Sequence, residues 1–173
     1  MRMNSDFKDL LRTFNEHNVR YLVVGGYAVI KYTEPRYTKD LDVWVEASSE
    51  NARAVFAALR AFGAPLVNIA ATDFAREGCI YQMGRPPARV DVLTSVDGVR
   101  FADAWPNRVA TDFGGIPAHV ISQQDLLANK RAVGRPQDQI DVNNLMDAER
   151  VIEKLQGPAK PKQGKPRDPE NER

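Results

Sequence analysis

The sequence predicts a mixed-sheet α/β or α+β domain, in which a β-sheet is flanked by helices and followed by C-terminal helices. Two observations on the pattern lead to this fold class. Stretches with helical periodicity alternate with short runs rich in β-branched residues, and two further helical stretches end the patterned part of the chain. The 173 residues are 43% hydrophobic and 27% charged, which is enough to bury a core without disulfides or structural metals.

The first half of the chain shows five expected elements. Phe7, Leu10, Leu11 and Phe14 share one helical face behind Ser5, which we expect to be the N-cap. A Gly-Gly pair interrupts the first strand, a proline ends the short helix that follows, and a serine begins the long helix that a glycine ends. In chain order, we expect a helix over 5–17, a strand over 20–24, a helix over 27–32, a strand over 39–46 and a helix over 49–62.

The second half continues with short strands and then two helices. The β-branched runs predict strands over 79–83 and 89–94, and a hairpin over 109–121 that turns at Gly114-Gly115. Ser122, with Asp125 three residues later, resembles a capping box and predicts a helix through Lys130. A last helix is expected from about Pro136 to Leu155.

Charge and cysteine content exclude several classes of protein. The 24 basic and 23 acidic residues give a net charge of +1, so no strong overall field recruits nucleic acid or a membrane. A single cysteine, Cys79, excludes an internal disulfide framework and fits a reducing compartment. No apolar run approaches the roughly 18 residues of a membrane span. We therefore expect a soluble, cytoplasmic protein with no membrane contact.

Residues 157–173 differ in composition from the rest. They hold four of the 11 prolines and no apolar residue larger than alanine or proline. Such a segment cannot bury enough surface to offset its ordering entropy. We expect one domain over 1–156 and a disordered Pro/Lys-rich tail over 157–173.

Two carboxylates on the strand over 39–46 are the first sign of chemistry. Asp40 and Asp42 are two residues apart, so both leave the same face with their Cα atoms about 6.5–7 Å apart. Two charges about 6 Å apart repel by roughly 3 kcal/mol at an effective dielectric of about 20, which a divalent cation would cancel. Oxygen ligands of this kind suit Mg²⁺ or Mn²⁺. Two solvated strand residues remain the alternative. Trp44 shares this face, either as a base-stacking group or as an ordinary strand aromatic.

Two further features strengthen the hypothesis of a site. Gly25 and Gly26 follow a strand, where glycines and a helix N-terminus let backbone N–H groups approach a phosphate; a plain tight turn is the alternative. Asp91 lies inside an apolar strand, where a carboxylate needs a partner. If its strand pairs beside 39–46, three carboxylates face one cleft.

These residues together resemble a known superfamily. Gly25-Gly26, Arg36-x-Thr38-x-Asp40-Leu41-Asp42 and the later Asp91 are similar to the nucleotidyltransferases related to DNA polymerase β. The resemblance is closer to small bacterial members, grouped with aminoglycoside nucleotidyltransferases and abortive-infection toxins. The stretch from Leu126 to Asp141, which contains Lys130 and Asp138, is also similar to that group. The resemblance covers roughly residues 5–150 and implies a nucleotidyltransferase-type sheet.

The resemblance implies transfer of a nucleoside monophosphate from an NTP to a hydroxyl, by a two-metal mechanism using Mg²⁺ or Mn²⁺. Asp40, Asp42 and Asp91 would be the catalytic and metal-binding residues. Gly25, Gly26, Arg36, Thr38 and Lys130 would bind the nucleotide. Asp138 and Asp141 are additional candidates, although acidic residues in a first helical turn also stabilise the helix dipole. Many relatives carry Ser after the glycines, where this chain has Tyr27.

Two other functions stay open. A non-catalytic module of the same fold could bind a partner protein, as in a toxin–antitoxin pair, although such a role has no need of three repelling carboxylates. A metal-dependent glycosyltransferase could use Asp-x-Asp, but the Gly-Gly pair and the short chain argue against it. The acceptor hydroxyl could belong to a small molecule such as an antibiotic, to a tRNA end or to a protein.

Overall fold

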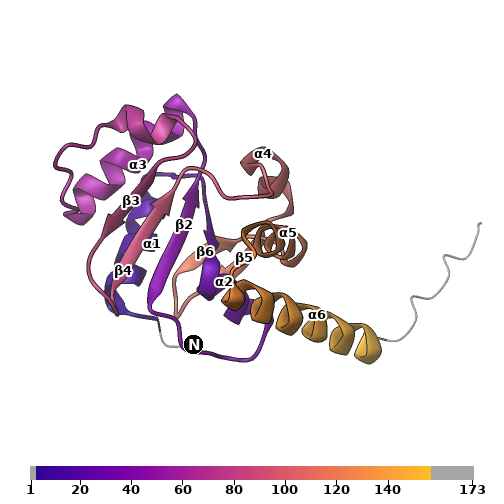
Figure 1. The fold of residues 1–173 in the computed structure, drawn as a ribbon. Helices are drawn as coiled ribbons and strands as arrows, with labels where there is room; N and C mark the ends of the chain where they lie inside the picture. Colours follow the sequence, from indigo (N-terminus) through magenta and orange to yellow (C-terminus); the bar gives the residue numbers. More distant parts are fainter. Residues whose placement is uncertain (1–2, 157–173) are drawn as a thin grey trace, which may run out of the picture.

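The computed structural model describes residues 3–156, which form a six-stranded mixed sheet flanked by helices (Figure 1). The strand order is β3-β4-β2-β1-β6-β5. The strands are β1 (Tyr21–Val24), β2 (Asp40–Val45), β3 (Ile80–Met83), β4 (Arg89–Leu93), β5 (Val109–Asp112) and β6 (Pro117–Val120). The helices are α1 (Ser5–Glu16), α2 (Gly25–Tyr32), α3 (Ser49–Phe62), the 3-10 turn η1 (Ala71–Ala75), α4 (Phe101–Ala104), η2 (Trp105–Asn107), α5 (Gln123–Val133) and α6 (Pro136–Gln156). The predicted fold class is confirmed.

Strand β2 lies near the middle of the sheet and pairs differently on its two sides. It runs antiparallel to β1, with Val24 opposite Asp42, and parallel to β4, with Asp42 opposite Asp91. Leu41, Val43 and Val45 are fully buried, as the alternation along this strand predicts. The opposite face of β2 is therefore left to Asp40, Asp42 and Trp44.

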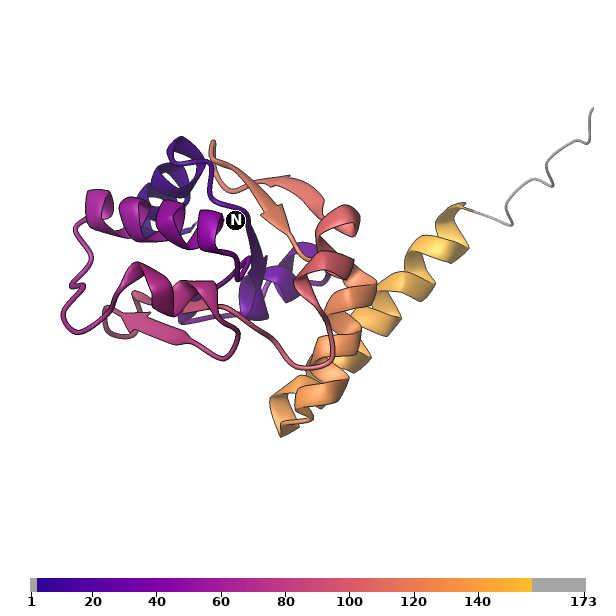
Figure 2. The same cartoon turned by 90° about the horizontal axis from the view of Figure 1, so that it is seen from above.

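The helices connect the sheet to the C-terminal part of the chain. α1 and α3 pack against each other, while α2 contacts β1, β2, α5 and α6. α5 packs along the first part of α6, and α6 then extends away from the sheet (Figure 2). In this way α2 holds the two C-terminal helices close to the carboxyl-bearing end of the sheet.

Several local expectations need correction. Asn4, not Ser5, caps α1, because its side chain accepts a hydrogen bond from the N–H of Asp6. The helix after the glycines begins at Gly25 rather than at Tyr27, so the glycines form its first turn. The short elements η1, α4 and η2 were not predicted, since three to five residues are too few to show a period. Ser122 does cap α5, through the N–H of Asp125.

Two aromatic side chains near the glycines and aspartates belong to the core. Trp44 is only 1% exposed and its ring meets Phe101 edge to face, so the base-stacking alternative is wrong. Tyr27 is buried too, with edge contacts to Phe7 and Phe113. The residue that follows the two glycines is therefore a packing position in this chain.

None of the helices in the described part of the chain is long and apolar enough to cross a membrane. The expected tail over 157–173 lies outside the described residues.

Candidate active site

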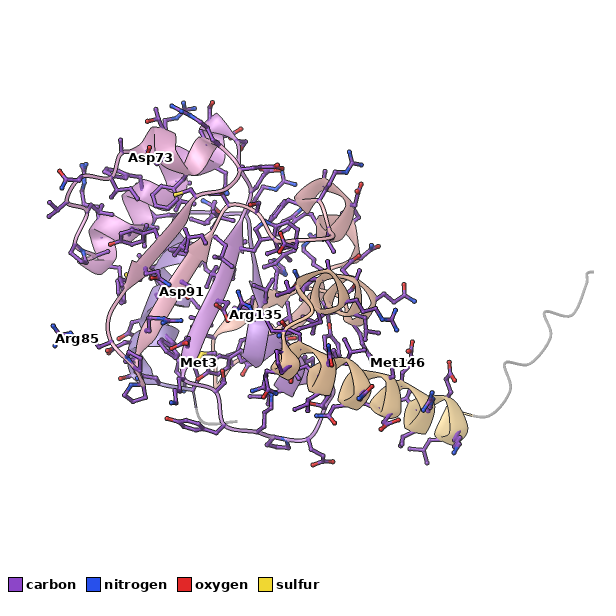
Figure 3. All side chains as sticks on the ribbon, in the orientation of Figure 1. Met3, Asp73, Arg85, Asp91, Arg135 and Met146 are labelled. Carbon is purple, nitrogen blue, oxygen red and sulfur yellow. The ribbon has the colours of Figure 1, made fainter. Side chains whose placement is uncertain are left out.

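A cleft of about 490 Å³ opens between the sheet and the two C-terminal helices. Gly25, Asp42, Arg89 and Asp91 line it from the sheet side, together with Gln82 of β3. Lys130, Arg135 and Asp138 line it from α5, α6 and the turn between them. Figure 3 places Asp91 on the sheet and Arg135 near the start of α6, the two sides of this cleft.

The strand register explains why these residues meet. Asp42 lies beside Asp91 in the parallel β2–β4 pair, and beside Val24 in the antiparallel β1–β2 pair. Gly25 follows Val24 directly, so the start of α2 reaches the Asp42 carboxylate. Asp40 lies opposite Arg89 in the same register. The expected pairing of the Asp91 strand beside β2 is confirmed.

Gly25 is required by this close approach. Its φ of +61° lies in the left-handed region, and a Cβ at this position would overlap Oδ2 of Asp42 and lie 2.8 Å from its Cγ. No side chain caps the N-terminus of α2, unlike those of α1, α3 and α5. The first-turn N–H groups of α2 therefore lie beside the carboxylates without a side-chain partner, which favours an anion there.

Gly26 is equally crowded, by the loop that precedes β2. A Cβ on Gly26 would overlap the hydroxyl of Thr38 and lie 3.7 Å from a guanidinium nitrogen of Arg36. Thr38 and Arg36 therefore lie beside the first turn of α2. This contact brings three of the residues singled out in the sequence into one neighbourhood.

Two of the three carboxylates contact the same side chain, the guanidinium of Arg89. A terminal nitrogen of Arg89 donates to Oδ2 of Asp40 at 2.9 Å and to Oδ2 of Asp91 at 3.1 Å, and Nε lies 3.1 Å from Oδ1 of Asp91. Gln82 also donates to Asp91, at 3.2 Å. Oδ1 of Asp40 is buried and accepts no hydrogen bond from the described residues. The pair Asp40 and Asp91 is thus held together by protein groups.

Asp42 has a different environment. Burial, with the nearby charges of Asp91 and then Asp40, raises the pKa of Asp42 from 3.8 to about 7, although Lys130 and Arg89 act in the opposite direction. Within the described residues, no hydrogen bond or ion pair holds its side chain. Without a bound cation this carboxyl is therefore partly protonated at neutral pH.

A buried ion-pair network forms the opposite wall. Nζ of Lys130 lies 2.7 Å from Asp138 and 3.1 Å from Asp141, and Arg36 reaches Asp141 at 3.0 Å. The side chain of Asp141 is fully buried and that of Lys130 is 11% exposed. The network fixes Lys130 at the cleft and ties α5, α6 and the loop before β2 together.

These residues suit a hard divalent cation. Carboxylate oxygens are its preferred ligands, and both Asp40 and Asp91 carry a buried oxygen that accepts no hydrogen bond from the described residues. Among residues 3–156, no three His, Cys, Asp or Glu side chains stand ready as a metal cluster. In this structure Arg89 donates to both Asp40 and Asp91. The carboxylate oxygens therefore fit a divalent cation. The guanidinium of Arg89 contacts two of the same carboxylates.

The structure brings most of the sequence candidates together. Asp42, Asp91, Gly25, Lys130 and Asp138 line the cleft. Asp40 joins them through Arg89, and Gly26, Thr38, Arg36 and Asp141 lie in the adjoining contacts. Arg89, Gln82 and Arg135 were missed. For Arg89 a signal existed, because residues two apart on a strand share a face, and Arg89 is two residues before Asp91.

The sheet and its carboxyl-lined cleft define a nucleotidyltransferase-like domain, and solved structures share its fold. The lincosamide antibiotic adenylyltransferase LnuA, solved with lincomycin, aligns with a TM-score of 0.53 and 17% identity over 85% of this chain and 98% of its own. The aminoglycoside enzyme ANT(2'')-Ia, solved with adenylyl-2''-tobramycin, aligns with a TM-score of 0.50 and 14% identity over 87% and 89%. An antigenic nucleotidyltransferase-like protein from Paracoccidioides brasiliensis gives 0.51 and 12% over 87% and 79%.

The family assignment rests on the sequence itself. Residues 1–156 match the family described as "Nucleotidyltransferase of unknown function (DUF6036)", and the chain belongs to that family. The comparison with curated proteins gave no match. The expected membership in the nucleotidyltransferases, and among their small members, is confirmed.

Proposed function

We propose that this protein transfers a nucleoside monophosphate from an NTP to the hydroxyl of an acceptor and releases pyrophosphate. The observation that carries the proposal is the register that sets Asp42 beside both Asp91 and the uncapped start of α2. Carboxylates for a cation and amides for a phosphate then occupy one cleft. The acceptor oxygen forms a bond to the α-phosphorus while the bond to the pyrophosphate oxygen breaks.

Each group in the cleft has a role in this proposal. Asp40 and Asp42 would hold Mg²⁺ or Mn²⁺, with Asp91 completing the set. The bound cation supplies neutralisation of the charge on the phosphates. The N–H groups at Gly25 and Gly26 bind phosphate oxygens, and Lys130 contributes a positive charge from the opposite wall. Asp91 accepts the proton of the acceptor hydroxyl.

A second cavity offers room for the acceptor. It measures about 570 Å³ and shares Ser95 and Val96 with the cleft. Both residues follow β4, the strand that carries Asp91, so an acceptor bound there lies on the Asp91 side of the site. The volume suits a small molecule. The antibiotic ligands of LnuA and ANT(2'')-Ia support an acceptor of that size.

The test is transfer of label from each of the four α-labelled NTPs. Mg²⁺ or Mn²⁺ is added with a cell lysate or with a panel of hydroxyl-bearing aminoglycosides and lincosamides. Wild type should label an acceptor and release pyrophosphate. Asp91→Asn should not, while Asp147→Asn, an exposed change on α6, should behave as wild type. No transfer from any NTP, with tight binding of a partner protein, would instead support the non-catalytic module.

A further inference from the structure

Arg89 is the one cleft-lining side chain of the described residues that bridges two of the three aspartates. Its guanidinium contacts Asp40 at 2.9 Å and Asp91 at 3.1 Å through one nitrogen, and Asp91 again through Nε. The forked guanidinium matches carboxylate geometry, and its charge offsets part of the repulsion between the two aspartates. Arg89 therefore takes the place that a cation shared by Asp40 and Asp91 would need.

The same side chain is free to leave that place. It is 35% exposed, and it lines the cleft that also contains the start of α2. Its backbone is fixed in β4 opposite Asp40, so only the side-chain torsions need to change. A displaced guanidinium remains in the same cleft, where an anionic ligand can replace the carboxylates it has lost.

We propose that Arg89 is a resident cation, which a divalent metal displaces from Asp40 and Asp91 when metal and nucleotide bind together. This inference rests on the proposed function for the nature of the ligand. Without ligand, Arg89 keeps the two carboxylates in position and lowers the affinity for free metal. With nucleotide, the triphosphate takes over the guanidinium. Metal and nucleotide therefore bind cooperatively through Arg89, which acts as a positioning residue.

The first measurement is the Mn²⁺ affinity of the full chain by calorimetry, without nucleotide. Arg89→Gln should bind Mn²⁺ at least about tenfold more tightly than wild type, because the competitor is gone. Arg135→Gln is the matched control. It removes the same charge from the same cleft, from an exposed side chain for which the structure gives no contact to the three aspartates, and should change the affinity less than about threefold. Equal effects of the two variants would overturn the proposal, because general electrostatics would then explain both.

The second measurement is the coupling between metal and nucleotide. α,β-Methylene ATP, which cannot be cleaved at the α-phosphate, should tighten Mn²⁺ binding more in wild type than in Arg89→Gln. If Arg89→Gln fails to fold without metal, Arg89→Lys decides the question. A lysine keeps the charge but cannot span both aspartates, so its Mn²⁺ affinity should lie above that of wild type. An affinity at or below that of wild type would overturn the proposal.

The outcomes separate this inference from the proposed function. If the protein transfers no label but Arg89→Gln still tightens Mn²⁺ binding, the inference about Arg89 stands and the proposed reaction fails. If the protein transfers label but Arg89→Gln leaves Mn²⁺ binding unchanged, the proposed reaction stands and the inference about Arg89 fails.

Discussion

Gly25→Ala should weaken the binding of metal and nucleotide at least about tenfold while leaving the fold intact. The left-handed φ of +61° costs an alanine about 1–2 kcal/mol. A domain whose stability is about 5–15 kcal/mol can lose that much and stay folded. The added Cβ would also overlap Oδ2 of Asp42. Carbon and oxygen need about 3 Å or more, so the carboxylate must rotate away. Rotation about the Cα–Cβ bond moves the carboxylate, whereas Cβ of Asp42, 3.0 Å from the added Cβ, needs only a small shift of β2.

Gly63→Ala is the matched control for this change. Gly63 also has a left-handed φ, of +88°, but a Cβ there meets nothing within 4 Å. Both variants should lose about 1–2 kcal/mol, a fall in melting temperature of roughly 2–8 °C for a domain of this size. The rise in melting temperature on adding Mg²⁺ with ATP should persist in Gly63→Ala and be clearly smaller in Gly25→Ala.

The effect of Gly25→Ala on affinity follows from the displacement of Asp42. Ligand positions in such sites tolerate only about 0.5 Å, so a loss of at least tenfold in affinity is expected. Calorimetric titration with Mn²⁺ and α,β-methylene ATP measures it. An unchanged affinity in Gly25→Ala, with the fold shown intact by circular dichroism, would refute the placement of Asp42 in the binding site.

Three more outcomes are expected. Asp91→Asn should lower turnover in the label-transfer assay at least about 10²-fold, with a much smaller change in nucleotide affinity, because Asp91 acts on the acceptor proton; an equal loss in both would contradict that role. Metal-free Asp42→Asn should gain stability over wild type as pH rises. The folded protein keeps the Asp42 proton up to a pKa of about 7 whereas the unfolded chain loses it near 3.8, so wild-type stability falls across that interval. The advantage should grow by about 3 kcal/mol between pH 5 and pH 8 in urea denaturation, and a constant difference would contradict it. Asp141→Asn should lower the free energy of unfolding by roughly 3 kcal/mol, because it removes the buried carboxylate between Lys130 and Arg36. The exposed control Asp147→Asn should lower it by less than about 0.5 kcal/mol, and similar melting temperatures of the two variants would contradict the network.

The strands carried most of the information that the sequence offered about the site. Alternation along 39–46 predicts that Asp40 and Asp42 share a face, and in β2 both are half-buried and alternate with the buried Leu41 and Val43. The pairing of the Asp91 strand beside β2 could only be stated as a condition, because strand order depends on contacts between distant residues. Parallel pairing with β4 meets that condition.

Long-range ion pairs were beyond sequence reasoning. Asp138 and Asp141 were open between a helix-dipole role and a functional one. Both partner Lys130, and Asp141 also partners Arg36, which lies 105 residues away in the chain. No local period reports such a contact. Arg89 illustrates the opposite case, since its spacing to Asp91 was visible and only its reach to Asp40 needed the register.

The division of charge in the cleft has a consequence for protein synthesis. The aspartates of the sheet are made first, and Lys130 and Asp141 come from the last two helices. A ribosome therefore completes the acidic half of the cleft before the lysine wall exists. A chain that stops before α5 carries crowded carboxylates and no Lys130, so it cannot assemble the cleft. Removal of α5 and α6 would therefore take away one whole wall of the cleft, so the acidic strands alone do not form the site.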